Sequence, residues 1–184
     1  MTPLRTERLI LRNWEERDRE LFHRINSDER VMEFFVMRRN RAESDAMMDW
    51  IAAGIDRNGF GFTAVELADS GDVAGFCGLH LTNNIPGVAD GTVETGWRMA
   101  PEFWGKGIAG EAARAWRDFG FDDLGLERII SFAVAGNHRS TAVMRRIGMT
   151  ARPDLDFDHP NVPDTHPELI RHVLYEMLPG DPRR

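Results

Sequence analysis

The sequence predicts one α/β (α+β) domain, in which a mixed, mainly antiparallel sheet is flanked by helices. Two observations predict this class. Short turns separate three successive strand-like segments, at 61–67, 73–81 and 92–99, as in an antiparallel meander. The hydrophobic period then changes from two to 3.6 over 108–119, before a buried strand at 128–134. A strand, a helix and a strand in that order indicate one parallel pair with a crossover helix.

The other elements follow from the same two periodicities. Residues 9–14 alternate as a strand, and 15–26 carry apolar residues at helical spacing. A second helix is expected at 44–57, with Ser44 as its N-cap. Towards the C-terminus we expect a helix at 138–147, a loop at 153–168 and a last strand at 171–177.

Composition indicates a soluble, cytoplasmic protein that forms a single domain over residues 1–184. The chain is 42% hydrophobic, and no stretch has the length of a signal peptide or a membrane span. Its 23 Lys and Arg residues against 30 Asp and Glu give a net charge of −7, which argues against a nucleic-acid partner. Cys77 is the single cysteine, so an internal disulfide is excluded, and a strand-like setting favours an inert, packed thiol.

The segment Pro101-Glu-Phe-Trp-Gly-Lys-Gly-Ile-Ala-Gly110 lies between an expected strand and an expected helix. Glycines 105 and 107 allow the backbone to approach a ligand closely. The start of the helix adds unpaired N–H groups and the positive end of a dipole, which together suit a phosphate or pyrophosphate. The alternative is a tight turn whose glycines serve only geometry.

Two other phosphate-loop families fit this segment less well. A nucleoside-triphosphate loop requires Ser or Thr after its lysine, whereas Gly107 follows Lys106. The dinucleotide fingerprint G-x-G-x-x-G is matched literally by Gly105, Gly107 and Gly110. It also requires an acidic residue at the end of the next strand, where the sequence has Val134-Ala-Gly-Asn137. An NAD(P)-binding oxidoreductase therefore stays open as an alternative.

The same segment resembles a known family. Phe103-Trp-Gly-Lys-Gly-Ile-Ala109 is similar to the acyl-CoA pyrophosphate loop of the GNAT superfamily, [QR]-x-x-G-x-[GA], with Trp104 at its first position. That replacement is found in the branch of the ribosomal-protein N-terminal acetyltransferases RimJ and RimL. Asn137-His-Arg-Ser-Thr-Ala-Val-Met-Arg-Arg-Ile-Gly-Met149 resembles a second motif of that branch, and Thr6-Glu-Arg-Leu-Ile-Leu-Arg12 resembles its first strand.

The resemblance covers residues 6–149 and implies the GNAT (acyl-CoA N-acyltransferase) fold. It implies transfer of acetyl from acetyl-CoA, the co-substrate, to a primary amine that attacks the thioester directly in a ternary complex. A protein N-terminus, an amino acid, a polyamine and an aminoglycoside stay open as acceptors, and a homodimer is possible. A non-catalytic CoA-binding module is a further alternative. No metal, nucleic-acid or membrane partner is expected.

The resemblance also implies which residues bind the cofactor. The backbone at Met99 and Ala100 would follow the pantetheine, the amides of 105–109 would bind the pyrophosphate, and Asn137 would lie near the thioester. The expected cofactor-binding residues are Met99, Ala100, Trp104, Gly105, Lys106, Gly107, Ile108, Ala109, Asn137, Ser140 and Met144.

Two residues are candidates for catalysis. Glu94, on the strand before the loop, could accept the amine proton, or it could be an ordinary strand glutamate paired with Arg98. Ser140 holds the motif position that the resemblance places near the CoA sulfur, although it also suits a cap in the first turn of its helix. Many relatives carry, at the position of Met144, a tyrosine that serves as the general acid. Tyr175 does not match that position, so the general acid is unassigned.

The acceptor side has weaker signals. Trp14, Trp50, Trp97 and Trp116 are expected in the core, although Trp14 and Trp97 could line an acceptor pocket. The loop from Asp154 to His166 holds four acidic residues and two histidines, which is typical of a polar loop rather than of a metal site. We expect it to cover the acceptor and to supply negative charge for an amine, with Phe157, Asp158 and His159 as the residues concerned.

Overall fold

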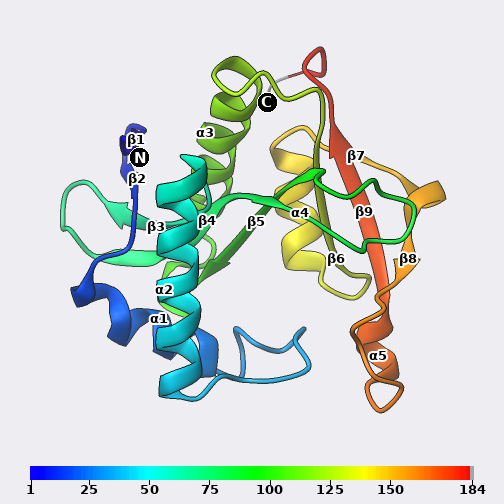
Figure 1. Ribbon diagram of the computed structural model, residues 1–184, viewed down its shortest axis with the longest axis horizontal. Coiled ribbons are helices and arrows are strands. Elements are labelled where there is room, and N and C mark those ends of the chain that lie inside the picture. Colours follow the sequence, from blue (N-terminus) through cyan, green and yellow to red (C-terminus); the bar gives the residue numbers. More distant parts are fainter. Residues whose placement is uncertain (183–184) are drawn as a thin grey trace. The chain divides into compact units, whose positions relative to one another are not determined.

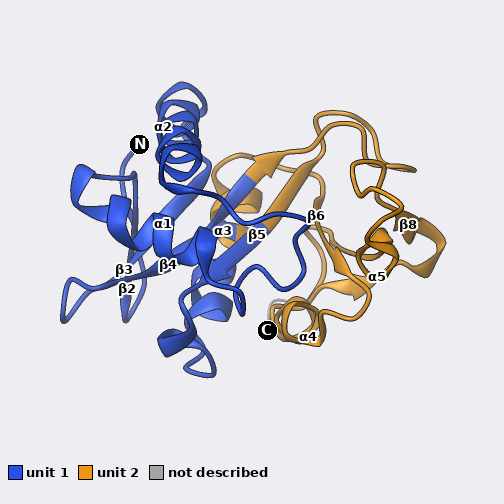
Figure 2. Ribbon diagram, turned by 90° about the horizontal axis from the view of Figure 1, so that it is seen from below, with its two compact units in different colours: residues 1–79, 96–116 blue, residues 80–95, 117–184 orange. Residues whose placement is uncertain are grey.

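The computed structural model describes residues 1–182, which form two compact units (Figures 1 and 2). Unit 1 comprises 1–79 and 96–116, and unit 2 comprises 80–95 and 117–182. Strands β4 (Val73–Leu81) and β5 (Val93–Met99) and helix α3 (Ile108–Asp122) each belong partly to one unit and partly to the other.

Unit 1 contains a sheet that is antiparallel wherever its pairings are resolved. Strand β2 pairs with β1 on one side and with β3 on the other, and β3 pairs in turn with β4. A register shift between Val65 and Glu66 interrupts the β3–β4 ladder. The elements that complete this unit with β4, β5 and α3 are β1 (Leu4–Arg5), β2 (Leu9–Arg12), α1 (Arg19–Ser27), α2 (Arg41–Asn58) and β3 (Phe62–Leu67).

Helices cover both faces of the unit 1 sheet. Successive residues of a strand point to opposite faces, so Thr63 and Ala64 of β3 define the two sides. Ala64 packs in the cluster that α1 and α2 supply, whereas Thr63 Oγ1 accepts a hydrogen bond of 3.2 Å from Trp116 Nε1 of α3. The helices α1 and α2 therefore lie on one face and α3 on the other.

The start of α2 corrects one prediction. The helix begins at Arg41, because the Asn40 side chain accepts from the backbone N–H of Glu43 while the Glu43 carboxylate accepts from the N–H of Asn40. This reciprocal capping box satisfies donors that the first turn would otherwise leave unpaired. Ser44, the predicted N-cap, lies inside the helix and is buried. The helix is one turn longer than the apolar periodicity indicated.

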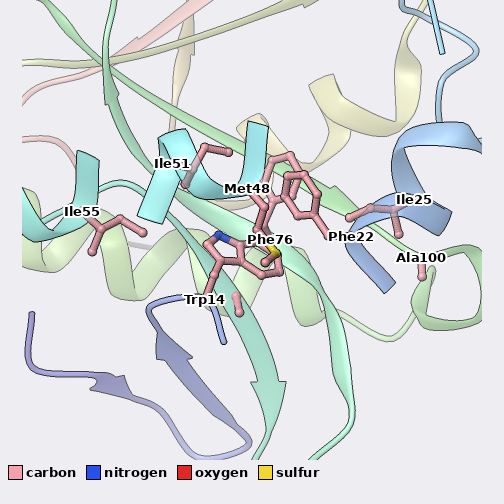
Figure 3. Close-up of a cluster of buried hydrophobic side chains, with 9 residues drawn as sticks. Trp14, Phe22, Ile25, Met48, Ile51, Ile55, Phe76 and Ala100 are labelled. Atoms are coloured by element: carbon pink, nitrogen blue, oxygen red, sulfur yellow. The ribbon is translucent and has the colours of Figure 1, made fainter. Parts of the chain in front are cut away.

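An aromatic cluster forms the core between α1, α2 and the sheet of unit 1 (Figure 3). The rings of Trp14 and Phe22 meet edge to face, with centroids 4.7 Å apart, and Trp14 Nε1 donates to Phe62 O at 2.8 Å. Burial of large apolar side chains is the main favourable term in such a core. The cluster comprises Trp14, Phe22, Ile25, Met48, Ile51, Ile55, Ala64, Phe76 and Ala100.

A buried ion network ties β2 to the turn that follows it. The Arg12 guanidinium donates from Nη1 and Nη2 to Asp18, at 2.7 and 3.0 Å, and from Nε to Glu66 at 2.7 Å. The carboxylate of Asp18 also accepts from the N–H of Glu15 at 2.8 Å. Arg12, Asp18 and Glu66 are each less than 10% exposed. Each charge is therefore compensated inside the protein.

Unit 2 contains the parallel pair that the sequence predicted. Strand β5 pairs in parallel with β6 (Ile129–Val134) through Glu94 and Ile130, and β6 pairs antiparallel with β9 (Arg171–Met177), whose bounds match the prediction. These pairings confirm a mixed, mainly antiparallel sheet. The other elements of the unit are α4 (His138–Arg146), β7 (Thr150–Ala151), β8 (Phe157–Asp158) and α5 (Pro167–Ile170).

The segment 153–168, predicted to be a loop, contains more structure than expected. The short strand β8 lies within it and pairs antiparallel with β9, through Phe157 opposite His172 and Asp158 opposite Arg171. A two-residue strand has too few alternating positions to be recognised from sequence. Among the described helices, none combines the length and the apolar character needed to cross a membrane.

We expect Asp18→Asn to lower the free energy of unfolding by about 3–5 kcal/mol, because it leaves the buried Arg12 charge partly uncompensated. Glu16→Gln is the matched control, since Glu16 pairs with Arg19 at the surface and exposed pairs contribute about 0–1 kcal/mol. Urea denaturation of the two variants measures the difference. Equal effects would show that the Arg12 network contributes no more than a surface pair.

Candidate functional site

The predicted phosphate loop connects β5 to α3 within unit 1. Strand β5 ends at Met99, a single 3-10 turn covers Pro101–Phe103, and α3 begins at Ile108. Gly105 and Gly107 have φ of 74° and 78°, in the left-handed region that residues with a Cβ atom adopt at a cost. The carbonyl of Gly107 accepts the first hydrogen bond of the helix, from Glu111 N at 3.0 Å. The two glycines thus set the path of the chain into α3.

The backbone N–H groups of 105–110 donate to no other group in the described residues. The neighbouring amides are paired, with Trp104 N bonded to Pro101 O and Glu111 N to Gly107 O. Residues 105–107 are exposed, so the unpaired donors at the start of this loop face solvent. Consecutive free amides at the N-terminal end of a helix attract an anion, through their hydrogen bonds and through the helix dipole. This geometry is what a phosphate or pyrophosphate requires.

Trp104 fixes the loop against the strand that precedes it. Its indole Nε1 donates to Met99 O at 2.8 Å. Ala100 uses both its backbone groups inside unit 1, donating to Ala74 O at 2.9 Å and accepting from Phe103 N at 3.0 Å. Met99 and Ala100 are buried. The resemblance implies that these positions contact the cofactor, and the structure shows that their backbone groups support the loop.

Arg8 supports the loop from its other side, and sequence reasoning missed it. Its Nη1 donates to Lys106 O at 3.2 Å, while Nε and Nη2 bind the Glu111 carboxylate at 2.7 and 2.6 Å. Thr6 Oγ1 donates to the same carboxylate at 2.5 Å. Hydrogen bonding and the Arg8 charge hold the pKa of Glu111 below its ordinary value, although burial opposes this. The acid at the start of α3 is therefore neutralised beside the free amides.

Two further cations lie along the loop. Lys106 Nζ stands 5.4 Å from the centre of the Phe103 ring. A Cβ atom added to Gly110 would lie 3.6 Å from Nη1 of Arg114, a residue that sequence reasoning also missed. Residues four apart on a helix share a face, so the spacing of Gly110 and Arg114 could have identified this neighbour. Positive charge thus surrounds a loop in a chain whose net charge is −7.

The second motif forms the start of α4, within unit 2. Asn137 is the N-cap of this helix, and its Oδ1 accepts from Ser140 N at 3.1 Å. Ser140 therefore does not cap the helix, and its hydroxyl has no hydrogen bond in the described residues. Met144 is 1% exposed, so its side chain packs in the interior of the unit. The hydroxyl of Ser140 is the group in this motif that stays available.

Glu94 is partly buried in unit 2 and has no hydrogen bond or ion pair there. Burial raises the pKa of its carboxyl to about 8, because the charged form loses its hydration. The alternative prediction, a pair with Arg98, finds no support in the contacts of unit 1, where Arg98 binds Asn26 instead. A carboxyl with a pKa near neutrality, free of partners, is suited to accept or donate a proton.

Several other candidates prove to be structural. Cys77 is fully buried, and burial raises the pKa of its thiol, so a reactive thiolate is disfavoured as expected. The hydroxyl of Tyr175 accepts from Arg145 Nη1 at 3.0 Å. Trp14 and Trp116 lie in the core as predicted. Trp50 does not, because it is 58% exposed on the side of α2 opposite to its apolar residues.

Most acidic side chains of the loop that was expected to cover the acceptor are paired with other groups of unit 2. Asp156 accepts from Leu174 N at 3.0 Å, and Asp158 binds Arg171 at 3.3 Å. Asp154 likewise pairs with Arg152, so of the four acidic residues only Asp164 lacks a partner in the described part of the chain. Phe157, predicted to face an acceptor, is 4% exposed and packs as a core residue. The prediction for Phe157 was therefore wrong, since its period-two position in β8 faces inward.

His159 belongs to a small cluster of rings in unit 2. Its ring centroid lies 4.9 Å from that of His172 and 5.9 Å from that of Phe157. Burial lowers the pKa of both histidines, and the proximity of His159 lowers that of His172 further. No group of three or more potential metal ligands lies among the described residues. The neutral forms of the two rings are favoured in the folded protein.

Known proteins are similar to this chain over most of its length. A family model described as an acetyltransferase (GNAT) domain matches residues 8–150. The chain is 32% identical over 153 residues to the FsC-acetyl coenzyme A-N(2)-transacetylase of Aspergillus fumigatus, covering 80% of this chain and 64% of that protein. It is 30% identical over 144 residues to the uncharacterized N-acetyltransferase YnaD of Bacillus subtilis, covering 78% and 80%. The crystal structure of an acetyltransferase (GNAT family) from Bacillus anthracis is 25% identical, with a TM-score of 0.80 and coverage of 96% and 98%.

We expect His159 and His172 to contribute a slope of falling stability as the pH falls from about 7.5 to about 5.5, because they resist protonation when folded. The raised pKa of Glu94 contributes a slope of the opposite sign, which is the same in all the proteins compared. The folded pKa values of the two histidines lie below the ordinary one, so below about pH 6.5 the unfolded chain binds protons that the folded chain does not. His172→Gln should flatten this slope, whereas His138→Gln, at an exposed position, should not. Urea denaturation at both pH values measures the slopes, and parallel slopes for all three proteins would contradict the assignment.

Proposed function

The chain belongs to the GNAT acetyltransferase family, and we propose that it transfers an acetyl group from acetyl-CoA to a primary amine. The observation that carries this proposal is the run of unpaired amides at 105–110, which begins at the exposed residues 105–107 and continues into the first turn of α3. A pyrophosphate offers several anionic oxygens in a row, which matches consecutive N–H donors better than a single carboxylate does.

In this proposal the amides of 105–109 bind the CoA pyrophosphate, and Arg8, Lys106 and Arg114 add positive charge around it. Trp104 holds the loop in place through Met99 O, while buried Ile108 anchors the first turn of α3. Ala100 is fully buried and both its backbone groups are already bonded, so in this proposal it positions the end of β5 beside the pantetheine. The cofactor thus binds to a loop whose shape is set before binding, which limits the entropy lost on association.

Asn137 and Ser140 serve the reactive end of the cofactor. The Oδ1 of Asn137 is used as the cap of α4, so its Nδ2 is the atom left to donate to the pantetheine or the thioester. The free hydroxyl of Ser140 lies one turn into the same helix and donates to the sulfur as the thiolate leaves. Met144 supports this helix from the interior.

Glu94 acts as the general base. In its ionised form it accepts a proton from the ammonium form of the acceptor, and the neutral nitrogen then forms a bond to the thioester carbonyl carbon. The C–S bond breaks as the tetrahedral intermediate collapses, and the second proton lost by the nitrogen passes to the CoA thiolate, which leaves the amide and the CoA thiol. A pKa of about 8 leaves part of the population ionised at neutral pH and makes that form a stronger base than an exposed carboxylate.

The acceptor and the branch of the family stay predictions. The resemblance to the ribosomal-protein acetyltransferases favours a protein N-terminus, and a small amine fits the same chemistry. Fold alone does not select between them, because recognition belongs to side chains outside the shared cofactor loop.

Gly107→Ala tests the loop directly. We expect acetyl-CoA affinity to fall at least about tenfold, because a Cβ atom at φ of 78° strains the loop by about 1–2 kcal/mol and tilts its amides. Gly59→Ala is the matched control, since Gly59 also has φ of 78° but ends α2, with no atom near the added Cβ. Isothermal titration of both variants gives the affinities. Equal affinities would remove the loop from the cofactor site.

Glu94→Gln tests the base. We expect kcat to fall about 100-fold or more, with little change in the KM for acetyl-CoA. The wild-type rate should rise with pH through an ionisation near 8, because the base form is the ionised one, and the variant should lack this step. Glu127→Gln, at an exposed position, is the control. A variant that keeps the wild-type pH profile would assign the proton transfer elsewhere.

A further inference from the structure

Arg98, near the end of β5, is a partly buried arginine with no counter-ion in unit 1. Its Nη1 donates to the buried Asn26 Oδ1, and its guanidinium carbon lies 4.2 Å from the Phe35 ring centre and 5.1 Å from that of Phe76. Its Nε is sealed from solvent and has no hydrogen-bond partner. No carboxylate of unit 1 contacts it. A charge shielded from water is usually compensated by an opposite one, and this guanidinium has no such partner in unit 1.

The buried arginine of the same unit, Arg12, shows how a guanidinium charge is compensated in this chain. Arg12 is held by two carboxylates, Asp18 and Glu66, which use all three of its nitrogens. Arg98 has one amide oxygen and two aromatic faces. Aromatic faces stabilise a cation by about 0.5–2 kcal/mol, which is much less than a buried carboxylate supplies. The two sites thus differ in that Arg12 has carboxylate partners and Arg98 has none in unit 1.

A second cation stands beside Arg98. The charge of Arg39, together with burial, lowers the pKa of Arg98 to about 10, so the guanidinium stays charged at neutral pH. Arg39 itself has no ion pair in the described residues, although its backbone N–H donates to Asn26 O at 2.9 Å. Its neighbour Arg38, by contrast, pairs with Glu29. Both arginines bond Asn26, Arg98 through the side-chain oxygen and Arg39 through the carbonyl oxygen, and two like charges held near one residue repel each other unless an anion lies between them.

The segment between α1 and α2 gives access to these cations. Phe35, which covers the Arg98 guanidinium, is 46% exposed, and Met37 two residues later is also exposed. Exposed large apolar side chains next to uncompensated charge are typical of a ligand site rather than of a plain surface. An entering group could thus meet an aromatic face and two guanidinium groups together.

We propose that Arg98 and Arg39 form a binding site for an anionic group, a carboxylate or a phosphate, on the acceptor amine. The inference rests on the proposed acetyltransferase function and names its substrate class: an amine that also carries an anion. Arg98 follows Glu94 by four residues in the sequence of β5. Such an anion site selects against polyamines and other purely cationic acceptors.

Direct anion binding tests the site without turnover. Because Arg98 Nε is shielded from solvent, its N–H exchanges slowly and gives an NMR signal, which is assigned by its loss in Arg98→Lys. We expect saturable shifts of this signal on titration with inorganic phosphate or acetate, and none with chloride at equal ionic strength. The Arg12 Nε signal is the internal control, since that group is already paired with Glu66. If neither phosphate nor acetate shifts the Arg98 signal, or if chloride shifts it equally, the proposal is overturned.

Acceptor kinetics test the same site in catalysis. The acceptors are ω-amino acids of increasing length, each paired with its own carboxamide, and O-phosphoethanolamine paired with ethanolamine. We expect kcat/KM to favour the anionic members at least about tenfold, as one charged hydrogen bond supplies. Arg98→Met should abolish this preference and leave the KM for acetyl-CoA unchanged, whereas Arg38→Met should retain it.

The outcomes separate this proposal from the proposed function. Equal or better turnover of neutral amines by the wild type, with no effect of Arg98→Met, overturns the anion site while leaving the acetyltransferase intact. If no amine is acetylated but phosphate or acetate shifts the Arg98 signal, the anion site stands and the proposed activity fails. Carboxylate and phosphate acceptors are distinguished by which matched pair shows the preference.

Discussion

The candidate site depends on a row of backbone N–H groups, at 105–110, that the protein itself leaves unpaired. A folded chain pairs nearly all of its buried backbone donors, and helix starts are commonly capped by a side chain. Here α3 is instead preceded by two solvent-facing glycines in the left-handed region, Gly105 and Gly107, in a loop that Trp104 holds from one side and Arg8 from the other. The loop is therefore a rigid frame of donors that an anion completes.

Charged groups inside the protein divide into two kinds. Those of the Arg12 network have partners for every nitrogen and tie β2 to its neighbours, so they contribute to stability. Glu94 and Arg98 are partly buried, yet each lacks a counter-ion in its own unit, and burial raises the pKa of Glu94 and lowers that of Arg98, which favours the neutral form of each. Groups kept in that state at a cost to stability are typical of functional sites, where the substrate supplies what is missing.

The order of elements and the phosphate loop could be predicted from sequence, because both rest on local signals. Periodicity gave β9 at its observed bounds, and glycine spacing gave Gly105 and Gly107. The sequence predictions that failed concern elements whose bounds or existence depend on tertiary contacts. Asn40 rather than Ser44 caps α2, since a reciprocal bond with Glu43 decides the start, and β8 exists only because β9 offers it a partner. Arg8 and Arg98 were invisible as site residues, because nothing local shows that the first binds Lys106 O or that the second lacks a carboxylate.

The most direct test of the central claim follows the amides themselves. In an NMR titration of the 15N-labelled protein with acetyl-CoA, we expect the largest backbone shifts at 105–110, since these donors gain acceptors for the first time. NADPH, which also carries a pyrophosphate, is titrated in parallel and should perturb them far less. Shifts that avoid 105–110, or that are larger with NADPH than with acetyl-CoA, would contradict the account and favour a dinucleotide site.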